Sequence, residues 1–249
     1  MIICKSPAEI ERLRRSGRMA RGLLEELHER VQPGVSTLEL EKYIERRITQ
    51  LGARPAFKGY RGYPCCLCAS ANSEVIHGIP SERSLEKGDI LSLDLGVVLE
   101  GYYGDSAITV SVGGIPESTQ RLLRVTQEAL QLAIDKARLG NRVGDISSTI
   151  QRHAEQNGFS VVREFVGHGI GRQLHEEPQV PNFGQPGHGP VLKQGMVLAI
   201  ETMINAGGSA VRVLADNWTA VTADGSLSAH FEHMVAISRN GPDVLTMQG

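Results

Sequence analysis

The segment from Ile90 to Val112 constrains the fold more than any other part of the chain. It holds two long apolar runs, Ile90 to Leu99 and Tyr102 to Val112, that are separated only by Glu100-Gly101. Strand-like runs joined by two turn-forming residues are typical of an antiparallel β-hairpin. Hairpins such as this one, rather than crossovers, join most of the predicted strands, so we expect a sheet that is largely antiparallel.

Two carboxylates lie inside this hairpin, where the sequence is otherwise apolar. The expected register places Asp105 opposite Gly96 and Asp94 opposite Ala107. The two acids are then diagonal neighbours on one face, about 7–8 Å apart at Cα. Buried acids are rare unless they are paired or bind a metal, so the hairpin predicts a cation site. The alternative is that each acid faces water.

Two further acids, Glu201 and Glu232, interrupt the apolar runs VLAIETMI and FEHMVAI. Carboxylates about 4 Å apart repel by roughly 4 kcal/mol at an effective dielectric near 20, so a convergent group must take up protons or cations. Two divalent ions would neutralise four carboxylates. A carboxylate-rich site with one imidazole suits manganese, iron, cobalt or zinc.

The remaining sequence predicts helices and further strands. Apolar residues at helical spacing predict four helices, over Pro7 to about Val31, Thr37 to Leu51, Thr119 to Ala137 and Asp145 to Asn157. Apolar, partly β-branched runs predict additional strands over Met196 to Ile204, Val211 to Leu214, Trp218 to Thr222 and Phe231 to Ser238. The Gly- and Pro-rich stretch from His168 to Lys193 is expected to be a loop that shapes a site.

A weak internal repeat links the two halves of the chain. An offset of 106 residues superposes Gly34 on Gly140 and Gly52 on Gly158, and it also aligns core positions between them. This suggests one duplicated domain over 1–249, with halves at about 1–113 and 114–249.

Composition excludes several classes of protein. With 41% hydrophobic and 22% charged residues, the chain of 249 residues is neither disordered nor collagenous. A formal charge of -2 gives no bulk attraction to nucleic acid or an anionic membrane, and no apolar run is long enough for a membrane span. Four cysteines, three of them within one tetrapeptide, fit a reducing compartment. We expect a cytoplasmic protein.

Six motifs in order resemble the type I methionine aminopeptidases of the bacterial kind: VIHGIP, SLDLG, YYGDSAITV, VGHGIGRQLHEEP, AIETM and SAHFEH. The resemblance extends from about Ile3 to Ile237. It implies an α+β fold of the pita-bread type, in which pseudo-twofold halves share a curved antiparallel sheet flanked by helices. About 30 residues separate Glu201 from Glu232, too few for the insertion of type II relatives, and we expect no N-terminal extension.

The resemblance also implies the roles of the site residues. The metal ligands it implies are Asp94, Asp105, His168, Glu201 and Glu232, which would hold two divalent ions. The catalytic groups it implies are His77, His175 and Glu201, with both histidines also contacting substrate. A pocket for the methionine side chain maps to Tyr60, Tyr63, Cys68 and Trp218, with Phe57 nearby, although Phe57 also fits ordinary core packing.

One position departs from the family pattern, because Leu174 stands where many relatives have an aromatic residue beside this pocket. The departure leaves the metal ligands intact and bears on the shape of the pocket. A monovalent cation near Asn72 and Ser228 is also suggested by the resemblance.

The leading hypothesis is removal of the N-terminal initiator methionine from nascent polypeptides with a small second residue, by attack of a metal-bridging hydroxide. One alternative is an Xaa-Pro-type peptidase of the same fold, and another is a non-catalytic binding module. The expected substrate suggests a transient contact with the ribosome. The resemblance favours a monomer.

Overall fold

The structure, a computed structural model, describes residues 1–247. Its helices are α1 (Pro7–His28), α2 (Thr37–Gln50), α3 (Glu117–Lys136), α4 (Val143–Gln156) and the short 3-10 helix η1 (Tyr60–Gly62). Each long helix agrees with its predicted range to within about three residues, because amphipathic spacing and clear stop signals define it.

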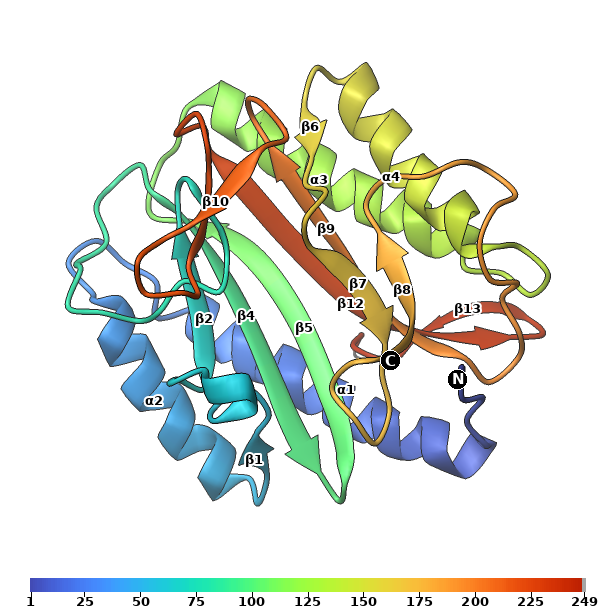
Figure 1. Cartoon of the computed structure of the whole chain (residues 1–249). Helices are drawn as coiled ribbons and strands as arrows, with labels where there is room; N and C mark the ends of the chain where they lie inside the picture. The colour runs from blue at the N-terminus through green and yellow to red at the C-terminus, as the bar shows by residue number, and fades with distance from the viewer. Residues whose placement is uncertain (248–249) are drawn as a thin grey trace.

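One large antiparallel sheet forms the centre of the molecule (Figure 1). Its main strands follow the order β1 (Arg54–Pro55), β4 (Ile90–Leu99), β5 (Tyr102–Ser111), β12 (Ser228–Ser238), β9 (Val197–Asn205), β7 (Val166–Gly169) and β8 (Glu176–Pro181). Three short strands pair at its sides: β2 (Leu67–Ala71) with β4, β6 (Ser160–Val161) with β9, and β13 (Gly241–Val244) with β12. A smaller sheet contains β10 (Val211–Val213), β11 (Ala220–Thr222) and β3 (Glu74–Ile76).

The long helices cover one side of the large sheet (Figure 1). Helix α1 lies behind β4 and β5, with α2 beside it next to β1 and β2, and α3 lies behind β9 and β12, with α4 beside it next to β6 and β8. Buried aliphatic side chains fill the space between the two layers; examples are Leu24, Ile44, Ile146 and Ile200, each fully buried. Burying such a side chain contributes about 1.5–3 kcal/mol. Because the long helices cover only this side, a functional site can form on the opposite side of the sheet.

Capping explains where α1 and α2 begin. The Ser6 hydroxyl accepts the backbone N–H of Glu9, and the Glu9 carboxylate accepts the N–H of Ser6. Ser36 and Glu39 form the same reciprocal pair at the start of α2. These capping boxes satisfy backbone donors that a helix N-terminus otherwise leaves free.

The internal repeat has a clear structural counterpart. Helix α4 matches α2 residue for residue at the offset of 106. Gly34 and Gly140 have φ of 92° and 89°, and Gly52 and Gly158 have φ of 72° and 76°. These values are accessible to glycine at little cost, so the repeated glycines mark repeated turns.

The central hairpin has the predicted register, with Asp94 opposite Ala107 and Gly96 opposite Asp105. Glu100 and Gly101 both have positive φ, 50° and 80°, as a type I′ turn requires. The prediction for this hairpin is confirmed.

The two halves of the sheet meet between β5 and β12, where side chains replace part of the backbone ladder. Glu232 is paired with Ala107, while the Ser106 hydroxyl donates to the Glu232 carbonyl at 3.0 Å. The Thr109 hydroxyl donates to the His230 carbonyl at 2.8 Å and also accepts the N–H of His230. These contacts hold the two halves in register at the centre of the sheet.

The stretch from His168 to Lys193 differs from the expected loop, because β7 begins just before it and β8 lies within it. Backbone pairing with neighbouring strands stabilises this Gly- and Pro-rich sequence, which has no hydrophobic alternation of its own. Strand β2 was also missed.

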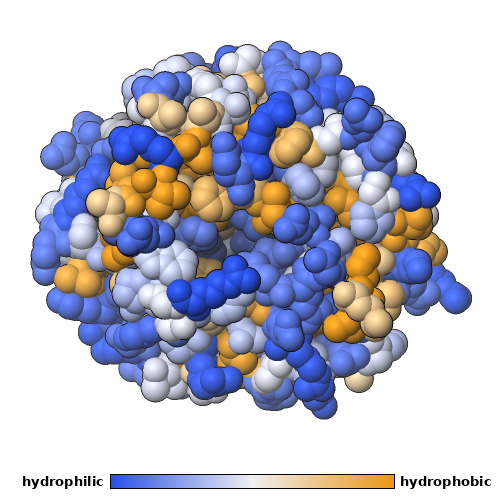
Figure 2. All heavy atoms as spheres, in the orientation of Figure 1, coloured by the Kyte–Doolittle hydropathy of each residue, from blue (hydrophilic) through white to orange (hydrophobic). Residues whose placement is uncertain are grey.

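All four cysteines are free thiols. Among the described residues, no helix is long and apolar enough to cross a membrane. On the face shown in Figure 2, hydrophobic residues are interspersed with hydrophilic ones.

Candidate active site

Three of the four predicted acids lie in one row across four strands of the sheet. Asp94 on β4 is opposite Ala107 on β5, which pairs with Glu232 on β12, and Glu232 is opposite Glu201 on β9. Cross-strand partners project from the same face, so the three carboxylates point to the same side. Asp105 is diagonal to Asp94 on that face, as the register predicted.

His168 reaches the row from β7. Its Nε2 lies 3.9 Å from Asp105 Oδ2 and 3.8 Å from Glu201 Oε1. One possible ligand atom from each of Asp105, His168 and Glu232 lies within 4.8 Å of the others. We call Asp94, Asp105, His168, Glu201 and Glu232 the acidic cluster; all five are buried, with exposed fractions of 8% or less.

The acidic cluster lacks the internal hydrogen bonds that would satisfy it. Asp94 Oδ1, Asp105 Oδ1 and Glu232 Oε1 are buried without a partner among the described residues. Burial raises the pKa of Asp94 to about 7, and burial and neighbouring carboxylates raise the pKa values of Asp105 and Glu232 well above their usual range. A divalent cation would satisfy these oxygens and favour their ionised form, so the residues fit a metal centre.

A second group of possible metal ligands differs from the acidic cluster, because its carboxylates are bound by other protein groups. Glu41, Glu45 and Cys66 also lie close together. However, the Glu41 carboxylate accepts the backbone N–H groups of Cys66 and Leu67, and Glu45 pairs with Lys58. These carboxylates have protein partners, so this group anchors the chain before β2 and does not require a metal.

Glu201 differs from the other acids of the cluster. Burial acts to raise its pKa, but the adjacent His230 imidazole more than offsets burial, so the pKa of Glu201 is lowered. Glu201 is therefore the carboxylate best suited to remain ionised and accept a proton.

The two remaining predicted histidines lie over the acidic cluster. His175 Nδ1 is 2.7 Å from the Tyr60 hydroxyl, and its ring packs edge-on against that of His168. His77 packs edge-on against Phe165 and Trp218. Burial lowers the pKa values of both His77 and His175 to about 4, so both rings are neutral at pH 7 and can each offer one donor and one acceptor.

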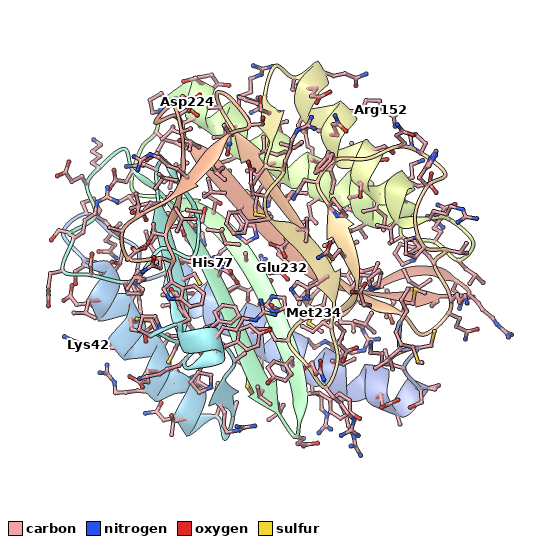
Figure 3. The ribbon with its side chains drawn as sticks, viewed as in Figure 1. Lys42, His77, Arg152, Asp224, Glu232 and Met234 are labelled. Atoms are coloured by element: carbon pink, nitrogen blue, oxygen red, sulfur yellow. The ribbon has the colours of Figure 1, made fainter. Side chains whose placement is uncertain are left out.

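A cavity of about 840 Å³ connects these groups. The whole acidic cluster lines it, together with His77 and His175 and all the predicted pocket residues: Phe57, Tyr60, Tyr63, Cys68, Leu174 and Trp218. Figure 3 shows His77 and Glu232 near the centre of the molecule, whereas Lys42, Arg152 and Asp224 lie at its periphery.

The pocket has a rigid, mainly apolar wall. The rings of Tyr63 and Trp218 meet edge-on at 5.1 Å, and the Tyr63 hydroxyl lies within hydrogen-bonding distance of the Leu67 and Gly78 carbonyls. Burial raises the pKa of the Cys68 thiol well above its usual range, so Cys68 stays uncharged. Such a wall suits an apolar side chain.

Sequence reasoning missed two residues near the site. Phe165 lines the cavity against His77, and His230 lies behind Glu201. The scarcity of aromatic residues could have drawn attention to Phe165. Strand alternation places His230 on the same face as Glu232, two residues away, and could have found it.

A buried ion pair holds the segment that carries His175. Lys5 Nζ lies 2.7 Å from Glu176 Oε2, and the two side chains are 4% and 6% exposed. Glu176 Oε1 accepts the backbone N–H of Gln173. Glu176 thus ties the turn before β8 to the segment that precedes α1.

We predict that Lys5→Met lowers the free energy of unfolding by about 3–5 kcal/mol, because it leaves the Glu176 carboxylate buried without its partner. Urea denaturation measures this change. Adding Glu176→Gln should recover much of the loss. The matched control is Arg15→Met, which breaks the exposed Arg15–Glu100 pair and should cost less than about 1 kcal/mol. A loss below about 1 kcal/mol for Lys5→Met contradicts the prediction.

Comparison with known proteins places this geometry in a family context. Residues 11–239 match the model of metallopeptidase family M24. A methionine aminopeptidase of Clostridium perfringens strain 13 is 53% identical over 247 residues, 99% of each chain. The crystal structure of a methionine aminopeptidase from Thermotoga maritima has a TM-score of 0.98 and 46% identity, covering both chains fully. A Bacillus anthracis Xaa-Pro dipeptidase has a TM-score of 0.80 at 22% identity, covering 99% of this chain and 62% of its own, and shares the fold. The predicted pita-bread fold is confirmed.

Proposed function

Because this chain belongs to metallopeptidase family M24, we propose that it is a metal-dependent methionine aminopeptidase of the bacterial type. It hydrolyses the peptide bond after an N-terminal methionine. The observation that carries this proposal is the position of the acidic cluster, which lines one cavity together with an apolar, aromatic pocket. The similarity to methionine aminopeptidases over the full chain favours this activity over that of an Xaa-Pro peptidase, whose likeness concerns the fold.

The acidic cluster would hold two divalent ions, drawn from manganese, iron, cobalt or zinc. Such ions, when bound, polarise a scissile carbonyl and lower the pKa of water. The unpartnered oxygens of Asp94, Asp105 and Glu232 and the imidazole of His168 support this assignment.

The chain's own residues supply proton transfer and positioning. Glu201 accepts the proton of the attacking water and passes it to the leaving amine, consistent with its lowered pKa. His175, held by the Tyr60 hydroxyl, faces the scissile amide and stabilises charge that develops on its oxygen. His77 contacts the peptide next to the scissile bond.

The pocket formed by Tyr60, Tyr63, Cys68 and Trp218 receives the methionine side chain, with Phe57 and Leu174 completing its wall. Their rings and alkyl groups match an unbranched thioether, and thioether sulfur packs favourably against aromatic rings. The rings of His77 and Phe165 meet edge-on in the wall of the cavity that the acidic cluster also lines, and their bulk supports selection of a small second residue.

The finer expectations belong to the same proposal. The enzyme acts in the cytoplasm as a monomer, on nascent chains, with a transient contact at the ribosome. Residues 1–249 act as one duplicated catalytic domain, of which 248–249 lie outside the described residues. A monovalent cation binds near Asn72 and Ser228, which are adjacent because the Ser228 N–H donates to the Asn72 carbonyl.

The test is peptide hydrolysis by the purified protein with each candidate metal and with a chelator. We expect release of methionine from Met-Ala-Ser, at least about tenfold less from Met-Leu-Ser, and none when metal is removed. Preferential cleavage of Ala-Pro-Ala would favour the Xaa-Pro alternative. Metal binding without cleavage of any peptide would favour a non-catalytic binding module.

A further inference from the structure

His230 is a buried histidine that the mechanism above does not use. It lies on β12, two residues before Glu232, and its side chain is 1% exposed. Its Nε2 is 3.5 Å from Glu201 Oε2, slightly too far for a formed hydrogen bond, and neither ring nitrogen has a hydrogen-bond partner among the described residues. A buried polar group without a partner is costly, so a polar group left so close to a catalytic carboxylate calls for a function.

The surroundings of His230 restrict where its ring can go. Its backbone N–H and carbonyl are both bound by the Thr109 hydroxyl, and its cross-strand partner is Met203 on β9. The Met203 N–H is in turn held by the Asn182 side chain. Fixed backbone on both strands keeps the imidazole beside Glu201.

Glu201 is consequently flanked by two imidazoles. Its Oε1 faces His168 Nε2 at 3.8 Å, on the side of the acidic cluster, and its Oε2 faces His230 Nε2 at 3.5 Å, on the other side. A donor on the His230 side would fix which oxygen of Glu201 is directed toward the acidic cluster.

We propose that His230 is a positioning residue for Glu201, whose Oε2 accepts a hydrogen bond from His230 Nε2–H so that Oε1 stays directed at the metal centre. This inference rests on the proposed function, since it concerns the carboxylate assigned to proton transfer. Groups that orient metal-site carboxylates typically affect metal affinity or turnover by about 10–100-fold when removed.

The first test reads the tautomer of His230 directly. Long-range ¹H–¹⁵N NMR of the histidine side chains, recorded for the metal-free and zinc-loaded wild-type protein, reports which ring nitrogen carries hydrogen. The signal is assigned with His230→Gln. We expect the Nε2–H tautomer in the zinc-loaded protein. An Nδ1–H tautomer in that state overturns the proposal, because Nε2 could not then donate. This readout is independent of peptide cleavage, so it stands even if the proposed activity fails.

The second test compares two substitutions. His230→Leu removes the donor and should lower kcat on Met-Ala-Ser by about 10–100-fold, with KM changed less than about threefold and weaker metal binding by calorimetry. His230→Gln keeps an N–H donor and should restore kcat to within about threefold of wild type. The matched control is His233→Gln, a histidine of the same strand that bonds Thr246 and faces away from the site, and it should leave kcat unchanged.

Two kinetic outcomes overturn the proposal. One is a folded His230→Leu enzyme with kcat within twofold of wild type. The other is a His230→Gln enzyme as impaired as His230→Leu, which would show that ring packing alone matters. If His230→Leu fails to fold, the tautomer and the kcat of His230→Gln decide the question.

Discussion

Replacing Asp105 with asparagine is expected to lower kcat at least about a thousandfold, a loss of about 4 kcal/mol in transition-state stabilisation. The substitution keeps the size of the side chain and removes one negative charge. Asp105 Oδ2 is 3.9 Å from His168 Nε2, and Asp105 shares the buried cluster with Glu232. An uncharged amide at this central position supports cation binding poorly, so at least one divalent ion should be lost.

Two measurements together check this expectation. Turnover of Met-Ala-Ser is measured at saturating metal, and the metal content of the desalted protein is measured by mass spectrometry. The matched control is Asp135→Asn on the exposed surface of α3, which should keep the metal content and the turnover of the wild type. Circular dichroism verifies that each variant is folded. An Asp105→Asn enzyme with more than a tenth of wild-type kcat and an unchanged metal content would contradict the assignment of Asp105 as a metal ligand.

The sequence predicted the centre of the site because the decisive information there is local. A two-residue turn determines the register of β4 and β5, and the register determines that Asp94 and Asp105 share a face. The predicted helices agree for a similar reason, since capping and amphipathic spacing act within a few residues.

The rest of the site depends on contacts between distant parts of the chain. Pairing of β9 with β12 brings Glu201 opposite Glu232, and no local pattern specifies which strands become neighbours. Their place inside apolar runs suggested that these acids converge, but only the family resemblance assigned them, together with His168, to one metal site. Strands β7 and β8 were missed because their pairing, not their composition, makes them strands.

Helix α1 packs very closely against the sheet at a point next to the acidic cluster. Gly104 on β5, next to Asp105, packs directly against the backbone of α1. A Cβ atom at Gly104 would lie 2.2 Å from the Ser16 carbonyl oxygen and 2.7 Å from the Gly17 nitrogen. The Ser16 hydroxyl also donates to the Tyr103 carbonyl at 3.0 Å, so helix and strand are tied at the same point.

Gly104→Ala should therefore lower the free energy of unfolding by about 3–5 kcal/mol, because helix backbone cannot move aside as a flexible side chain can. Urea denaturation checks this value. The matched control is Gly22→Ala within α1, where a Cβ meets nothing within 4 Å, and alanine should stabilise the helix by about 0.5–1 kcal/mol. If the change to alanine lowers the free energy of unfolding at Gly104 and raises it at Gly22, the loss at Gly104 comes from packing and not from helix propensity. Equal effects at both positions would refute close helix–sheet packing beside Asp105.

If Gly104→Ala folds, it should also bind metal more weakly, since displacement of β5 from α1 moves Asp105 within the acidic cluster.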